Sequence, residues 1–77
     1  MEKEIFTEVL KELRKQKKMT QESLAEHALI DGKHFGRIER GENNPTLNTF
    51  SKICIALKIS ESDFFKLVDS KTKNMKG

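Results

Sequence analysis

Residues 19–41, MTQESLAEHALIDGKHFGRIERG, decide the fold of this 77-residue chain. Thr20 and Asp31 each predict the start of a helix, because their side chains can accept a hydrogen bond from the free N–H groups of a first helical turn. The first helix runs to about His27, and the second ends before Gly41, which is placed as a C-cap glycine. Two short helices joined by a tight turn are therefore expected.

The side chains of these two helices divide into an inward and an outward set. Leu24 and Ala25 of the first helix, and Phe35 and Ile38 of the second, are expected to face the core. The small Ala25 allows the helices to cross closely, where a larger side chain would hold them apart. The second helix keeps a polar outer face, which is typical of a helix-turn-helix.

Three further helices are predicted outside this segment, and no strand alternation is present. Apolar residues recur every three or four positions over residues 4–17 and again after Thr46, another N-cap. The inward stripe of the fourth helix is expected to consist of Leu47, Phe50, Ile53, Cys54 and Leu57. The fold class is therefore predicted to be all-α, a compact five-helix domain in which helices 2 and 3 form the helix-turn-helix.

The fifth helix is expected to be short. It begins at Ser60, and Asp63 completes a start that is similar to a capping box. One domain then spans residues 1–69. Residues 70–77 are polar and rich in lysine, and we expect them to form a disordered tail.

The composition limits the classes of function. Lys and Arg outnumber Asp and Glu by 15 to 12, and the net charge of +3 suits a polyanion partner. No apolar run approaches the roughly 20 residues needed to span a membrane. A lone cysteine, Cys54, is typical of a reducing compartment, so a cytoplasmic protein is expected. His27 and His34 lack companion ligands at metal spacing, and no catalytic constellation is present, so we expect no metal, cofactor or enzymatic activity.

The sequence resembles the Cro/repressor-type helix-turn-helix family, also called XRE-like. The residues that carry the resemblance are Leu13-Arg14-Lys15, Thr20-Gln21-Glu22-Ser23-Leu24-Ala25, Ile38-Glu39-Arg40-Gly41, Asn44-Pro45-Thr46-Leu47 and Leu57-Lys58-Ile59-Ser60. These blocks occur in the family's order and cover about residues 6–68. The chain is most similar to single-domain phage repressors and to the controller proteins of restriction-modification systems.

The resemblance implies a transcriptional regulator whose third helix reads double-stranded DNA in the major groove. The expected base-reading residues are Gly32, Lys33, His34 and Arg37. Lys33 and Arg37 lie four residues apart, and such side chains donate to guanine O6 and N7. The alternative is that they form a solvated helix face. Gly32 and Gly36 are expected on the outward face, either to bring the helix axis close to the bases or because the helix frays.

The resemblance also implies phosphate contacts and a structural ion pair. The expected phosphate-binding residues are Gln21, Arg40, Asn43, Asn44 and Thr46, with plain turn chemistry as the alternative for the two asparagines. Arg14 and Glu39 are expected to form a buried ion pair between the first and third helices, because these positions do so in relatives.

Association with partners is expected at two surfaces. Phe64, Phe65, Leu67 and Val68 give a short helix more apolar surface than one face can bury, so we expect them to form a homodimer interface. The alternative is that all four cap the core of a single chain. A twofold dimer would read an inverted-repeat operator, with autoregulation as one option. Glu22 and Glu26 match positions that contact RNA polymerase in an activating relative, although a solvated face is favoured. The rival function is an antitoxin-like protein-interaction module, which an apolar patch outside the last helix would favour; none is expected.

One position departs from the family. Leu29 stands in the turn where many relatives have glycine. Either Leu29 adopts a left-handed conformation at a cost of roughly 1–2 kcal/mol, or the turn differs slightly, and we favour the second.

Overall fold

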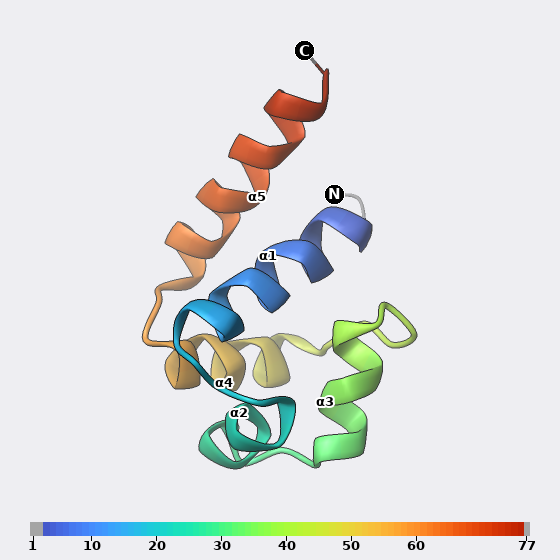
Figure 1. Cartoon of the computed structure of the whole chain (residues 1–77), viewed down its shortest axis with the longest axis vertical. Helices are drawn as coiled ribbons and strands as arrows, with labels where there is room; N and C mark the ends of the chain where they lie inside the picture. The colour runs from blue at the N-terminus through green and yellow to red at the C-terminus, as the bar shows by residue number, and fades with distance from the viewer. Residues whose placement is uncertain (1–2, 77) are drawn as a thin grey trace.

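The computed structural model describes residues 3–76, which form five helices and no strand. The helices are α1 (Lys3–Gln16), α2 (Gln21–Ala28), α3 (Gly32–Glu39), α4 (Leu47–Leu57) and α5 (Glu61–Lys76). The α1 and α5 helices lie beside one another, α4 crosses their base, and α2 and α3 form the opposite end of the molecule (Figure 1). The all-α, five-helix prediction is confirmed.

The predicted N-caps are present. The side chains of Thr20, Asp31 and Thr46 accept hydrogen bonds from the backbone N–H three residues later, at 3.0, 3.0 and 3.1 Å. Ser60 does the same for the N–H of Asp63 at 3.0 Å. Each cap satisfies a donor that the first turn of a helix leaves free, which explains why short helices begin sharply here.

The core is built around aromatic side chains. The rings of Phe6, Phe50 and Phe64 lie 5.0 to 5.6 Å apart between centroids, and they join α1, α4 and α5. Cys54 is buried beside them in α4, where burial, followed by the charge of Glu61, raises the pKa of its thiol to about 11. The predicted inward stripe of α4 is buried except at its first residue, Leu47.

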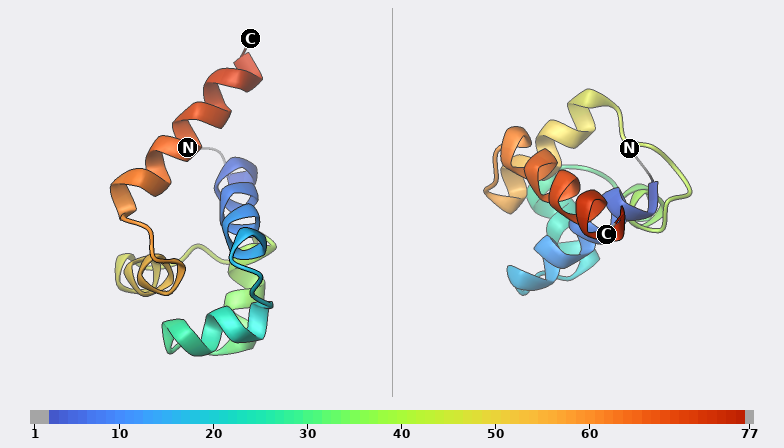
Figure 2. Two further views of the ribbon diagram at one scale, coloured as in Figure 1. Left: turned by 60° about the vertical axis from the view of Figure 1, so that its left-hand side comes forward. Right: turned by 90° about the horizontal axis from the view of Figure 1, so that it is seen from above.

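The α5 helix is longer than predicted. Residues 70–76 continue the helix instead of forming a disordered tail, and Gly77 lies outside the described residues. Lys71 explains part of the difference, because its Nζ lies 2.9 Å from Glu12 Oε1 and 3.5 Å from Glu8 Oε1 on α1. Figure 2 shows that α5 extends away from the α2–α3 end and is inclined to α1, which it crosses in the view from above.

The first four helices end in the same way. Lys18, Leu29, Gly41 and Lys58 have φ values of 56 to 79°, and the N–H of the residue after each bonds to a carbonyl five residues earlier. Leu29 is therefore left-handed, and the expectation that the turn would differ was wrong. Ile30 supplies the reason, since its N–H bonds to Ala25 O at 3.0 Å and its side chain packs against the core.

A buried ion pair connects α1 to α3, as predicted. Arg14 Nε and Nη2 donate to the two carboxylate oxygens of Glu39, both at 2.8 Å, and Arg14 Nη1 donates to the carbonyl of Met19 at 2.8 Å. Gln21 Nε2 adds a 3.1 Å hydrogen bond to Glu39 Oε1. The Glu39 side chain is 1% exposed, and no buried side-chain polar atom among the described residues lacks a partner. Burial raises the pKa of Glu39, but the hydrogen bonds from Arg14 and Gln21 outweigh burial and lower it overall.

We predict that Glu39→Gln lowers the free energy of unfolding by about 3–5 kcal/mol at neutral pH, because it leaves the Arg14 charge without its partner. The folded-state pKa of Glu39 lies below the ordinary 4.5, so its contribution is complete above that pH and is lost as the pH falls through the lowered value. The stability difference between the wild type and Glu39→Gln should therefore be constant above about pH 5 and narrow below pH 4.5. Urea unfolding at several pH values measures it.

The control is the exposed Glu22→Gln, which should change the stability by less than about 0.5 kcal/mol. A difference between wild type and Glu39→Gln that does not depend on pH would contradict the assignment.

The strain at Leu29 gives a second prediction. Leu29→Gly should stabilise the protein by up to about 1 kcal/mol, since glycine adopts a positive φ freely, although its greater freedom in the unfolded chain offsets part of the gain. Leu29 is 83% exposed, so little packing is lost. Thermal unfolding measures the change, with Glu26→Gly inside α2 as the control, which should destabilise by about 1 kcal/mol. A lower melting temperature for Leu29→Gly would contradict the argument.

Candidate nucleic-acid interface

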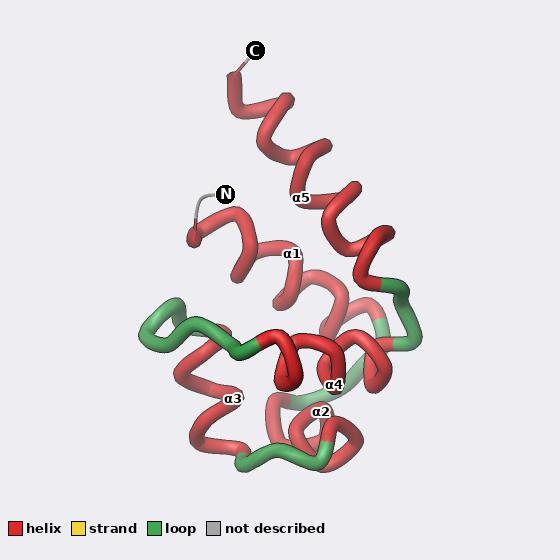
Figure 3. The backbone as a smooth tube through the Cα atoms, turned by 180° about the vertical axis from the view of Figure 1, so that it is seen from behind, coloured by secondary structure: helices red, strands yellow, loops and turns green. Residues whose placement is uncertain are grey.

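The α3 helix is fixed at both ends. At its start, Asp31 caps the first turn, and at its end Gly41, with φ of 79°, reverses the chain. Glu42 N donates to Arg37 O at 2.8 Å and Gly41 N to Ile38 O at 3.0 Å, which closes the last turn. Figure 3 shows α2 and α3 joined by a short loop, with the loop after α3 leading directly to α4.

The two faces of α3 are as predicted for four of its side chains. Phe35 and Ile38 are buried, whereas Lys33 and Arg37 are exposed and form no ion pair among residues 3–76. His34 is half-buried. A Cβ added at Gly32 would meet nothing within 4 Å, so this part of the helix surface is open. Two unpaired cations therefore lie on one accessible helix face.

Gly36 differs from the prediction. It is buried, not on the open outward face, because the side chains of Arg40 and Gln21 lie over it. A Cβ at this position would lie 3.1 Å from Arg40 Nη1 and 3.5 Å from Gln21 Oε1. The structure thus brings together two of the residues that were predicted to bind phosphates, although they belong to different helices.

Arg40 has a partner that the sequence analysis missed. Its Nε donates to Glu42 Oε2 at 2.6 Å, and both side chains are 54% exposed. This hydrogen bond raises the pKa of Arg40 and lowers that of Glu42. The only signal in the sequence was the spacing of two residues between opposite charges across a glycine.

The remaining predicted phosphate residues lie on the α3–α4 loop. Asn43, Asn44 and Thr46 are exposed. The Thr46 hydroxyl accepts a hydrogen bond from the N–H of Thr49 and donates one to the Thr49 hydroxyl at 3.0 Å. Its side chain is therefore engaged as the N-cap of α4. The side-chain amide nitrogen of Gln21 likewise donates a hydrogen bond to Glu39, which links the candidate interface to the buried ion pair.

The apolar surface of α5 is smaller than predicted. Phe64 and Val68 are 0% and 3% exposed and belong to the core of a single chain, because they point towards α1 and α4. Phe65 and Leu67 remain about 40% exposed. Two of the four residues assigned to a dimer interface are therefore unavailable to a partner.

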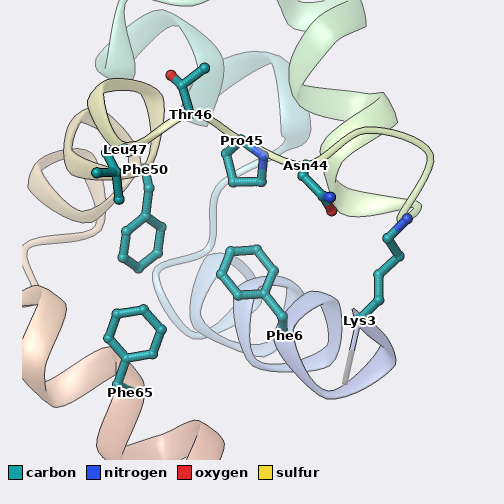
Figure 4. A pocket seen from close by; sticks show the side chains of 8 residues that line it. All are labelled: Lys3, Phe6, Asn44, Pro45, Thr46, Leu47, Phe50 and Phe65. Carbon is teal, nitrogen blue, oxygen red and sulfur yellow. The ribbon is translucent and has the colours of Figure 1, made fainter. Parts of the chain in front are cut away.

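Other apolar side chains take their place. Leu47, in the first turn of α4, was expected to face inward but is 85% exposed, and Ile55 is 75% exposed. Leu47, Phe50 and Phe65 line an open groove of about 360 Å³ whose other wall includes Phe6 (Figure 4). The expectation of no apolar patch outside the last helix was wrong.

Among residues 3–76, no three His, Cys, Asp or Glu side chains are grouped so that they could hold a metal ion. No helix in this part of the chain is long and apolar enough to cross a membrane.

Comparisons with known proteins agree with this geometry. A model of the helix-turn-helix family matches residues 10–64. The wild-type restriction-modification controller protein C.Esp1396I is 31% identical, with 88% of this chain and 87% of that chain covered and a TM-score of 0.83. The C.Esp1396I tetramer in complex with its natural 35 base-pair operator gives 32% identity, coverages of 86% and 87%, and a TM-score of 0.80.

The clp gene regulator ClgR from Corynebacterium glutamicum shares the fold at 22% identity, with 95% of this chain and 78% of that chain covered and a TM-score of 0.85. No curated protein matches the sequence. The family match spans more than half of the chain and includes every block on which the resemblance was based. The chain belongs to the Cro/repressor-type helix-turn-helix family.

Proposed function

We propose that the protein is a sequence-specific DNA-binding regulator of transcription that inserts α3 into the major groove. The observation that carries the proposal is the pair of exposed cations, Lys33 and Arg37, which lack ion-pair partners among residues 3–76. Both residue types donate to guanine O6 and N7, and the major groove is wide enough to admit an α-helix. Gly32 and His34 flank them on the same helix.

Contacts to the sugar-phosphate backbone would hold α3 in register. Gln21 at the start of α2 and Arg40 at the end of α3 lie over Gly36, and the exposed Asn43 and Asn44 follow on the loop. Helix N-termini offer free N–H groups to phosphates, so the beginnings of α2 and of α4 at Thr46 support such contacts.

A homodimer is the form that we propose to bind DNA. The occupant of the apolar groove is a second copy of this chain, which would cover Leu47 and Phe65. The tetrameric C.Esp1396I relative on its operator supports self-association. A twofold dimer presents two α3 helices about 34 Å apart, one turn of DNA, and so reads an inverted repeat.

Contact with RNA polymerase and autoregulation would extend this proposed function. Glu22 and Glu26 are exposed on α2, where they could contact RNA polymerase while α3 occupies DNA. Autoregulation fits the resemblance to controller proteins. The rival is an antitoxin-like module whose partner covers the groove around Leu47, and the exposed leucine favours it to that extent.

Selection from random duplex DNA tests the reading face. The wild type should enrich an inverted-repeat motif, and the Lys33→Ala/Arg37→Ala variant should enrich none, because each base contact contributes about 1–3 kcal/mol of discrimination. The control is Lys15→Ala/Lys66→Ala, which removes the same charge from α1 and α5 and should enrich the wild-type motif. Salt-sensitive binding without any motif in the wild type would instead support the protein-partner function.

Sedimentation equilibrium tests the dimer. Leu47→Glu should weaken self-association at least tenfold, because a carboxylate would be buried without a partner, while the fold is kept since the side chain is exposed. Leu29→Glu changes an equally exposed leucine at the other end of the molecule and should leave the dimer intact. A wild type that stays monomeric at high concentration would contradict the proposal.

A further inference from the structure

The guanidinium of Arg40 is hydrogen-bonded to Glu42 and lies over Gly36. Glu42 Oε2 accepts from Arg40 Nε at 2.6 Å, and Arg40 Nη1 lies over Gly36, 3.1 Å from the place of a Cβ. Gln21 Oε1 lies 3.5 Å from the same point. The Arg40 side chain, which is 54% exposed, therefore folds back along α3 towards Gln21.

The contact with Glu42 leaves donors for a phosphate. A guanidinium has five N–H groups in a rigid fork, and the bond to Glu42 uses the one on Nε. The Nη groups have no hydrogen-bond partner among the described residues. A flexible cation that is already held in place loses less conformational freedom when it meets a phosphate.

The two glycines of α3 have different surroundings. A Cβ at Gly32 would enter open space, whereas a Cβ at Gly36 would lie 3.1 Å from Arg40 Nη1, a tight contact that requires the guanidinium to shift by a few tenths of an ångström. The space above Gly36 is thus occupied by a side chain of the same protein. Close approach of the α3 backbone to DNA is not needed to explain this glycine.

We propose that Gly36 and Glu42 position Arg40 for a DNA phosphate, and that position 36 is glycine to make room for the guanidinium. The inference rests on the proposed function, because the phosphate belongs to the bound duplex. Gly36 and Glu42 are positioning residues that act through Arg40.

A double-mutant cycle tests the coupling of Gly36 to Arg40. The affinity for one duplex enriched by the wild type is measured by fluorescence anisotropy for the wild type, Gly36→Ala, Arg40→Ala and the double variant. Gly36→Ala should weaken binding roughly three- to tenfold when Arg40 is present, and less than about twofold in the Arg40→Ala background. Circular dichroism verifies that each variant is folded.

Two outcomes of this cycle would contradict the positioning role of Gly36. The same loss in both backgrounds would mean that the added methyl group meets DNA, and no loss with Arg40 present would mean that Gly36 does not position it. Gly32→Ala is the matched control, and its effect on affinity should be the same with and without Arg40, since its Cβ meets neither side chain.

A measurement on the free protein separates this inference from the proposed function. Arg40 lowers the pKa of Glu42, so an NMR titration of the Glu42 carboxyl reports on the contact without DNA. Both Arg40→Ala and Gly36→Ala should move that pKa towards its ordinary value, and Gly32→Ala should not. An unchanged pKa in Gly36→Ala would overturn the positioning role. Failure of the wild type to enrich any duplex would instead reject the proposed function.

Discussion

The carboxylate of Glu39 is the group on which the placement of α3 depends. It lies in the last turn of that helix, almost fully buried, and it receives three hydrogen bonds from side chains of α1 and α2. A buried charge is tolerated only when its partners are in place, so Arg14 and Gln21 fix the distance of α3 from the rest of the domain. Gln21 also reaches the outer surface near Arg40. Gln21, one of the candidate phosphate contacts, therefore belongs to the hydrogen-bond network that holds the buried carboxylate.

Local rules predicted most of the fold. The caps at Thr20, Asp31, Thr46 and Ser60 depend on one side chain and one N–H three residues away, so they are visible in sequence. The buried faces of the helices could also be predicted, because they depend on apolar residues only three or four positions apart in the sequence. The Arg14–Glu39 pair needed the resemblance, because the two residues lie 25 positions apart.

Contacts between elements explain the errors. Phe64 and Phe65 are adjacent and equally apolar, and only the position of α1 and α4 decides which of them is buried. The burial of Gly36 depends on two side chains from outside its own turn. Part of the extension of α5 is explained by Lys71, whose partner Glu12 on α1 lies 59 residues earlier in the sequence. Periodicity contains none of this information.

Because Cys54 is buried, the rate at which its thiol is alkylated reports how often the folded domain opens. As the single cysteine, it lies 2% exposed among apolar side chains, and its raised pKa keeps little thiolate at neutral pH. Alkylating reagents can reach the sulfur only when the domain opens, so the rate of labelling follows the unfolding equilibrium. A ligand slows that labelling, in proportion to its affinity and concentration, when the opening that exposes the sulfur also disrupts the binding site. Duplexes could thus be ranked in unmodified protein, without a fluorophore, a tag or an engineered residue.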